Sequence, residues 1–207
     1  MVLLLPLEMT RLMPERVLAW LGDKVPDSRL HHILRVEQTA ALLPSPAAAA
    51  GLIHDLTQNF TPQQPLEIAE VEGLEVEGFE QANPHLLHPL LGAIVARDRF
   101  GVQDEEILQE IENHTLGRPG TLRIGCIVFQ ADSIDLGRGQ TSELKAWGLV
   151  SWKNIAQAVW ESGDYYLKYL MNINRLIQHR TVLQQNWAMQ MASRNRPSAQ
   201  DNNFITA

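Results

Sequence analysis

The pair His54-Asp55 is the first place in this sequence where residue types and their position suggest chemistry. It stands at the end of an apolar run, and Ser45 and Pro46 ahead of that run are typical of a helix start. The pattern predicts a helix over residues 45–56 that is buried on all sides. An unpaired buried carboxylate is costly, so a cation should lie against Asp55, and the adjacent imidazole favours a metal ion.

Helical spacing brings a second imidazole inward. On a helix predicted over residues 28–43, His32 shares a face with Val36, whereas His31 shares its side with Arg35. We therefore expect His32 to face the core and His31 to face solvent.

Three later helices each deliver one more ionisable side chain to an apolar face. With these, the candidate metal ligands come from five segments: His32, His54, Asp55, His88, His114 and Asp132. Taken alone, a buried histidine is more often a hydrogen-bonded core residue than a ligand. If six buried ionisable groups paired only with one another, several would remain without a partner. One or two metal ions would accept all six as ligands.

The elements that must position these residues are all predicted to be helical, because no run of alternating β-branched residues indicates a sheet. The fold class is therefore all-α. We expect one domain over residues 1–190, with C-terminal helices over 141–190 and a disordered polar tail over 191–207. Within the domain we expect a short helix over 14–21, a solvated glutamate-rich segment over 63–80, a turn over 115–120, and separate helices over 141–161 and 165–187.

The composition bounds the class of protein further. A chain of 207 residues can build one sizeable core, and no internal linker indicates a second. A formal net charge of -7 argues against binding bulk nucleic acid or an anionic membrane, but it leaves room for a small phosphorylated ligand. The single cysteine, Cys126, fits a reducing compartment, and we expect neither a signal peptide nor a membrane span. The expected location is cytoplasmic.

Five short motifs carry a resemblance to a known family. They are Arg29-x-x-His32 with Arg35-Val36, the run Ala50 to Asp55, Leu87-His88 with Gly92-Ala93, His114-Thr115-x-Gly117-Arg118-Pro119, and Ala131-Asp132 with Gly137-Arg138. Over residues 29–138 the chain resembles the HD-domain metal-dependent phosphohydrolases, and within them the YqeK branch of symmetrical bis(5'-nucleosyl)-tetraphosphatases. Many hydrolases share the general HD pattern, whereas HTxGRP ahead of AD and GR is specific to this branch.

The resemblance implies a helical bundle with a dinuclear metal site in its core, and iron as the expected metal. It implies that His32, His54, Asp55 and Asp132 hold one ion and that His88 and His114 hold a second, with Asp55 bridging the two. Asp55, His88 and His114 would be the catalytic centre, and the substrate contacts would come from Arg29, Thr115, Gly117, Arg118 and Arg138. The implied reaction cleaves diadenosine tetraphosphate at its centre into two ADP.

At three positions the chain departs from the branch. Gln58 and Cys126 stand where lysines are expected, and Pro89 stands where a small residue is usual. None of the three is a proposed ligand, but the missing lysines bear on which polyphosphate is bound. Two other interpretations stay open: an HD hydrolase of mononucleotides or other phosphomonoesters, and a non-catalytic helical module that binds metal or nucleotide. A homodimer is compatible with all three.

Overall fold

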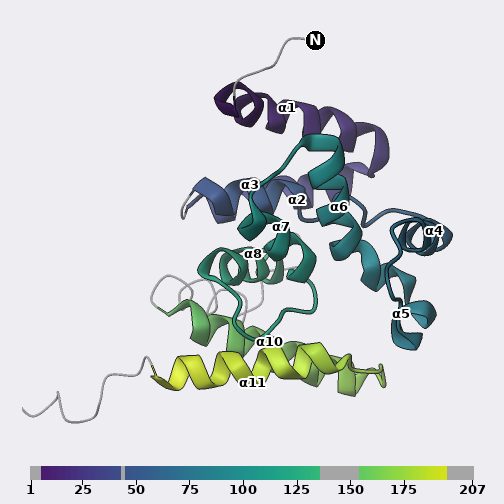
Figure 1. Cartoon of the computed structure of the whole chain (residues 1–207). Coiled ribbons are helices and arrows are strands. Elements are labelled where there is room, and N and C mark those ends of the chain that lie inside the picture. Colours follow the sequence, from purple (N-terminus) through teal and green to yellow (C-terminus); the bar gives the residue numbers. More distant parts are fainter. Residues whose placement is uncertain (1–5, 43–44, 136–153, 195–207) are drawn as a thin grey trace, which may run out of the picture.

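The computed structural model describes residues 6–42, 45–135 and 154–194, and every regular element in these ranges is a helix. The α-helices, with one 3-10 helix (η1), are α1 (Pro6–Lys24), α2 (Asp27–Ala41), α3 (Ser45–Ile53), α4 (Gln63–Val71), α5 (Gly78–Ala82), η1 (Pro84–Leu87), α6 (His88–Phe100), α7 (Glu105–Asn113), α8 (Arg123–Ser133), α10 (Ile155–Asn172) and α11 (His179–Arg194). The predicted all-α fold class is confirmed. Helix α1 lies at one end of the bundle and the α10–α11 hairpin at the other, with the site-bearing helices between them (Figure 1).

Helices α2 and α3 pack so closely that a side chain at Gly51 would not fit without movement. A Cβ placed there would lie 3.2 Å from the Glu37 Cα atom on α2. Small residues on α3 therefore allow the two backbones to approach each other. Helix α8 joins this pair through an apolar cluster formed by Val36, Ala40, Ala47, Ile127 and Ala131. As a result, the helices that carry His32, the His54-Asp55 pair and Asp132 share one packed core.

A second apolar cluster fixes α6 and α7 against the same pair. It joins α1, α2, α3, α6 and α7 through the buried residues Val17, Leu21, Ile33, Leu52, Ile53, Leu56, Ala93, Ala96, Phe100 and Ile111. Helix α7 is capped by Asp104, whose carboxylate accepts from the Glu106 and Ile107 amides. The ends of α6 and α7 that carry His88 and His114 are thereby held beside the end of α3.

The C-terminal hairpin packs on the other side of α8. Cys126, Val159 and Ala188 form the apolar contact between α8, α10 and α11. Burial is the largest cause that raises the pKa of the Cys126 thiol to about 12, so this cysteine stays protonated at neutral pH. Cys126 is a core residue, as expected of a small apolar side chain.

Two helix boundaries near the N-terminus differ from the prediction. Helix α1 includes Pro14 and continues past Gly22 to Lys24, because the stop comes from Pro26, which disfavours helical backbone in the preceding residue. Helix α3 ends at Ile53 and not at residue 56. The His54 imidazole donates to the Gly51 carbonyl. In a continuing helix that carbonyl would accept from the backbone amide of Asp55, so the side chain competes with the helix at this point.

The C-terminal helices also differ from the prediction. Helix α10 runs without interruption through residues 162–164, which the prediction left between two helices. A Cβ at Gly163 would lie 2.3 Å from the Gln185 side chain of α11, so the glycine allows the two helices to pack closely. The chain reverses after Asn172, with Asn174 in the left-handed region at φ 52°. Helix α11 then continues to Arg194, beyond the expected start of the polar tail at residue 191. The predicted helix over 141–161 lies outside the described residues up to 153.

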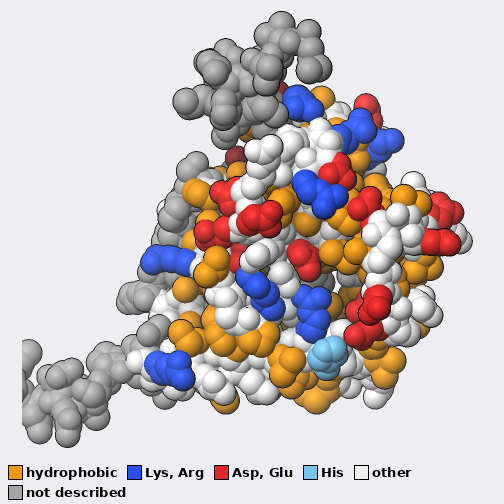
Figure 2. Space-filling view, in the orientation of Figure 1, with side chains coloured by type: hydrophobic (Ala, Val, Ile, Leu, Met, Phe, Trp, Pro, Cys, Tyr) orange, Lys and Arg blue, Asp and Glu red, His pale blue; other side chains and the backbone are white. Residues whose placement is uncertain are grey.

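The glutamate-rich segment behaves as expected for a solvated surface. Five of its glutamates are exposed and Glu80 is half-buried. Figure 2 shows acidic side chains on the surface around α4 and α5. Among the described residues, none of the helices combines the length and the hydropathy that crossing a membrane requires.

Candidate metal centre

The Asp55 carboxylate lies at the centre of the six candidate ligands, and its two oxygens face two different groups of imidazoles. Oδ2 lies 3.6 Å from His32 Nε2 and 3.5 Å from His54 Nε2. Oδ1 lies 3.5 Å from His88 Nε2 and 3.6 Å from His114 Nε2. The Asp55 side chain is only 4% exposed. The structure therefore brings together side chains from α2, the end of α3, α6 and the end of α7.

Asp132 completes the first of these groups from the last turn of α8. Its Oδ1 atom lies 3.1 Å from His32 Nε2. The donor atoms of His32, His54 and Asp132 all lie within 4.8 Å of one another, and so do those of His54, Asp55 and His114. All six predicted ligands thus surround one small volume.

Each of the four imidazoles is oriented by a hydrogen bond from its Nδ1 atom. His54, His88 and His114 donate to the backbone carbonyl three residues earlier, at 2.7, 2.6 and 2.7 Å, and His32 donates to Asp135 Oδ2 at 2.8 Å. In a neutral imidazole this bond places the proton on Nδ1 and leaves a lone pair on Nε2. In the neutral form of these imidazoles, the four Nε2 lone pairs point toward the Asp55 carboxylate.

The donor atoms of this cluster suit a bound cation. His54 Nε2 is buried and has no hydrogen-bond partner among the described residues, although a carboxylate oxygen lies 3.5 Å away. His88 Nε2 and His114 Nε2 lie 3.2 Å apart, so two lone pairs would face each other. A divalent ion relieves both repulsions, and mixed imidazole and carboxylate donors suit first-row transition metals. The cluster is a divalent metal site by the chemistry of its donors.

The electrostatics favour the metal-binding forms of His54, His88 and Asp55. For His32 and His114, burial is outweighed by the nearby carboxylates, which raise the pKa, so that a bound metal would displace a proton there. Burial lowers the pKa of His88 to about 3, assisted by the adjacent His114, so His88 is neutral at physiological pH. Burial alone would raise the pKa of the Asp55 carboxyl, but the surrounding imidazoles, led by His54, hold it well below its usual range. A deprotonated carboxylate and a neutral imidazole are the species that coordinate metals.

Two residues that the sequence analysis did not select hold His32 in place. Asp135 is buried and accepts from His32 Nδ1. Arg35 donates to both Asp135 oxygens, from Nε at 2.6 Å and from Nη2 at 3.0 Å. Carboxylates that accept from the second nitrogen of a metal-binding imidazole orient the ring and raise its basicity. The available signal was a second aspartate one helical step after Asp132, close to the end of an apolar helix.

The opposite orientations of His31 and His32 give a direct test of this geometry. His32 is buried and His31 is exposed, as predicted. We expect His32→Ala to lower bound metal and any metal-dependent turnover by at least about 100-fold, since it removes one ligand, and His31→Ala to change both less than about twofold. Metal titration of the two variants, measured side by side, checks the difference. Equal losses in the two variants would contradict the assigned orientations.

A cavity of about 600 Å³ opens over the ligand cluster. Its lining includes four of the candidate ligands, Asp55, His88, His114 and Asp132, together with Arg29, Gln58 and Thr115. The lining also includes Phe129 of α8 and three tyrosines of α10. Arg29 Nη1 donates to Asp55 Oδ2 at 2.7 Å, and the Thr115 hydroxyl lies 3.1 Å from His88 Nε2. The cavity volume falls in the range of about 300–1,000 Å³ that is typical of small-molecule sites.

Of the predicted substrate contacts, Arg29 and Thr115 lie in this cavity. Arg118 does not line it, because its guanidinium donates to Gln109 and lies 3.9 Å from the buried Glu110 carboxylate. Gly117 does not line it either, and a Cβ there would lie 2.5 Å from the Gln184 side chain in a backbone at φ 68°. Both residues lie in the turn after α7, and their contact with substrate stays a prediction. Arg138 lies outside the described residues.

The departures from the branch pattern fall in different places. Gln58 lines the cavity, whereas Pro89 is buried in the first turn of α6. Cys126 is buried against α10 and α11 and does not line the cavity. Only Gln58 can therefore affect a bound molecule directly.

Comparison with known proteins identifies the class. The family model of the HD domain matches residues 29–137, which is more than half of the chain, and the chain belongs to this family. A crystal structure of a predicted HD superfamily hydrolase involved in NAD metabolism from Clostridium acetobutylicum superimposes with a TM-score of 0.79 at 27% identity, covering 85% of this chain and 96% of that one. The predicted family is confirmed, and the chain is a metal-dependent hydrolase of the HD type.

Individual relatives are named for a more specific activity. A symmetrical bis(5'-nucleosyl)-tetraphosphatase from Bacillus subtilis is 29% identical over 181 residues, which cover 84% of this chain and 96% of the relative. A protein of the same name from Staphylococcus aureus is 30% identical over 56% of this chain and 63% of the relative. The HD-domain match over residues 29–137 contains all six candidate ligands.

Proposed function

We propose that this protein hydrolyses dinucleoside polyphosphates at a two-metal centre, and that its substrate is diadenosine tetraphosphate, cleaved into two ADP. The observation that carries the proposal is the Asp55 carboxylate, whose two oxygens face separate groups of imidazole nitrogens. A carboxylate between two ligand groups is the arrangement expected of a bridging ligand. The names of the relatives from Bacillus subtilis and Staphylococcus aureus support the substrate.

The proposed ligand sets follow from the distances. Oδ2 of Asp55 would join His32, His54 and Asp132 at one ion, and Oδ1 would join His88 and His114 at the other. The family resemblance makes iron the expected metal, and the imidazole and carboxylate donors are compatible with iron as with other divalent first-row ions. When bound, two ions would activate water at neutral pH and stabilise charge on phosphoryl oxygens.

The protein's own groups would bind and orient the polyphosphate. In the overall reaction, water oxygen becomes bonded to one of the two central phosphorus atoms, and the central anhydride bond breaks so that its oxygen leaves with the other ADP. Arg29 is positioned to interact with that developing charge. Its side chain is 29% exposed, and its fork of N–H groups can donate to a phosphate oxygen while Nη1 holds Asp55. Thr115 can donate its hydroxyl hydrogen from the same wall.

The tyrosines of α10 would contact the nucleoside end of the substrate. Tyr165, Tyr166 and Tyr169 are between 43% and 49% exposed and line the cavity. Large aromatic side chains at this exposure offer rings on which a nucleobase can stack, at about 1–3 kcal/mol per base. The α10–α11 hairpin would then supply base recognition, and the metal centre would supply the reaction.

This role predicts a separation of kinetic effects. We expect Tyr169→Ala to raise KM for diadenosine tetraphosphate roughly tenfold with kcat changed less than about threefold, because one stacking contact is lost and the metal ligands are untouched. Met171→Ala is the matched control, since Met171 is 56% exposed on the same helix but does not line the cavity. Steady-state kinetics of the two variants check the prediction, and an unchanged KM in Tyr169→Ala would contradict it.

The products distinguish the proposal from its alternatives. We expect the metal-loaded protein to convert diadenosine tetraphosphate to ADP alone, as measured by ion-exchange chromatography. Formation of ATP with AMP would show asymmetric cleavage, and release of inorganic phosphate from mononucleotides in preference would indicate the phosphomonoesterase alternative. Full metal occupancy without turnover of any of these substrates would favour a non-catalytic binding module.

A further inference from the structure

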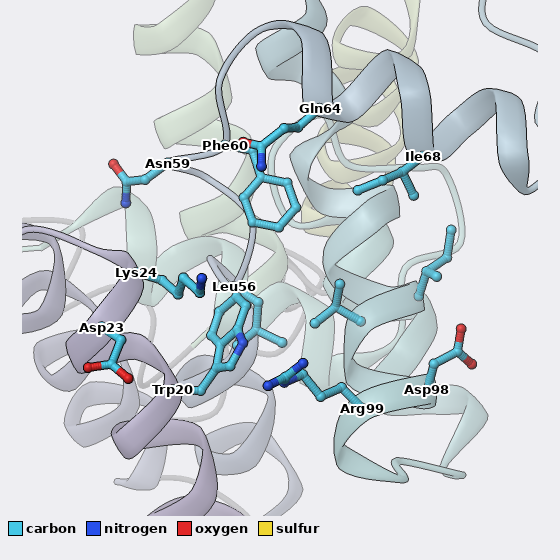
Figure 3. Close-up of a pocket in the computed structure, with 12 residues that line it drawn as sticks. Trp20, Asp23, Lys24, Leu56, Asn59, Phe60, Gln64, Ile68, Asp98 and Arg99 are labelled. Atoms are coloured by element: carbon cyan, nitrogen blue, oxygen red, sulfur yellow. The ribbon is translucent and has the colours of Figure 1, made fainter.

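A second cavity, of about 530 Å³, lies on the other side of the turn that carries Asp55. It is formed where the C-terminal end of α1 meets α4, α6 and the turn after α3, as Figure 3 shows. It shares no lining residue with the cavity over the metal ligands. Asp55 and Gln58 face the metal cavity, whereas Leu56, Asn59 and Phe60 line this one. The two sites are therefore distinct and are separated by one short turn.

Two aromatic side chains give this cavity flat apolar walls. Trp20 comes from α1 and Phe60 from the turn, and both are half-buried (Figure 3). The Trp20 ring is fixed by edge-to-face contact with Phe100, with the ring centroids 6.0 Å apart and an angle of 87° between the planes. A fixed indole beside a cavity of this volume offers a stacking surface for a planar molecule.

Two cations flank the indole. The Arg99 guanidinium carbon lies 5.9 Å from the centre of the Trp20 ring. Lys24 follows Trp20 by four residues on α1, so the two side chains occupy the same helical face. Both cationic side chains are exposed, and neither forms an ion pair within the described part of the chain. The cavity therefore has two positive charges available at its aromatic wall.

The acids in the same wall do not cancel these charges. Asp98 is held by Arg97, which donates to both of its oxygens at 2.6 and 2.9 Å. The Asp23 carboxylate is turned away from the Trp20 ring in Figure 3. With Asp98 paired to Arg97, Lys24 and Arg99 outnumber Asp23, and this local excess of positive charge favours an anion in a protein with a formal net charge of -7.

We propose that this cavity is a second ligand site, and that its ligand is a nucleotide whose base lies between Trp20 and Phe60 and whose phosphate contacts Lys24 and Arg99. A planar aromatic group and a compact anion in one molecule match the two kinds of side chain present. Asn59 and Gln64, which also line the cavity, supply amide donors and acceptors for the edge of a base. The inference does not depend on turnover at the metal centre.

Binding at this site can be measured through Trp20 itself. The chain has 5 tryptophans, and the fluorine resonance of 5-fluorotryptophan at position 20 can be assigned by its loss in Trp20→Phe. We expect AMP to shift this resonance in a saturable manner in the full-length protein. Adenosine alone and inorganic phosphate alone should bind at least about tenfold more weakly, because each keeps only one of the two kinds of contact.

Paired variants make the test specific. We expect the double variant Lys24→Ala, Arg99→Ala to weaken AMP binding at least about tenfold, since both phosphate contacts are lost. Arg175→Ala is the control, because Arg175 is an exposed arginine that does not line the cavity. Tyr169→Ala, in the metal cavity, should leave the Trp20 response unchanged. A Trp20 resonance that does not respond to millimolar AMP, or responds equally in the double variant, would overturn the proposal, as would loss of the response in Tyr169→Ala.

Discussion

Asp55→Ala is expected to lose metal and to lower kcat/KM for diadenosine tetraphosphate by at least roughly 10³-fold, which corresponds to about 4 kcal/mol of transition-state stabilisation. The reason is that Asp55 belongs to both proposed ligand sets, since its two oxygens face different groups of imidazoles. Loss of the carboxylate also leaves Arg29 without the partner that it contacts at 2.7 Å. Elemental analysis and steady-state kinetics on the same preparation measure both effects.

The control for this variant is another carboxylate outside the cluster. Glu75 is exposed and belongs to the solvated segment between α4 and α5, so Glu75→Ala should leave metal content and turnover unchanged. Asp55→Asn keeps the size of the side chain and separates loss of charge from loss of packing. Near wild-type turnover in Asp55→Ala would show that the bridging arrangement is wrong.

Gly125→Ala is expected to destabilise the fold by about 1–3 kcal/mol through overpacking. A Cβ at this position of α8 would lie 1.5 Å from Glu110 Oε2, and Glu110 is 1% exposed, so the carboxylate has no route to solvent without a local rearrangement. For a chain of this size such a loss lowers Tm by roughly 3–10 °C, which calorimetry on the wild type and the variant measures.

Two further variants give this prediction its controls. Gly22 lies on α1, and a Cβ there would have no neighbouring atom within 4 Å, so Gly22→Ala should not destabilise and should gain about 0.5–1 kcal/mol from helix propensity. Adding Glu110→Ala to Gly125→Ala removes the clashing group, and the double variant should be less destabilised than the sum of the two single variants. Equal effects of Gly125→Ala and Gly22→Ala would contradict the packing seen around Glu110.

Helical periodicity was sufficient to predict that His32 and His114 face the core. His32 and His114 were both selected by their spacing from apolar residues, and both are buried. Their orientation was beyond that argument, because it depends on hydrogen bonds from Nδ1 to a carbonyl or to Asp135, which only the folded backbone defines. The same limit explains Arg35, whose helical face was identified correctly but whose partner lies 100 residues away in the sequence.

The helix boundary that differs at α10 arose where a glycine serves the packing of two helices. Residues 162–164 were left between two predicted helices, yet Gly163 lies inside α10 and allows it to approach Gln185 of α11. Gly117 and Arg118, which are predicted substrate contacts, also have neighbours that the sequence did not indicate, since Gly117 lies against Gln184 and Arg118 donates to Gln109. Local sequence carries no information on which tertiary neighbour will use a glycine or an arginine, so these assignments required the packed structure.

The most direct test of the account is the number of metal ions bound to each chain. We expect the purified protein, reconstituted with ferrous iron under anaerobic conditions, to retain two ions per chain after gel filtration, because Asp55 offers one oxygen to each of two imidazole groups. Elemental analysis normalised to protein concentration gives this number. Retention of one ion or none in fully folded protein would contradict a two-metal centre.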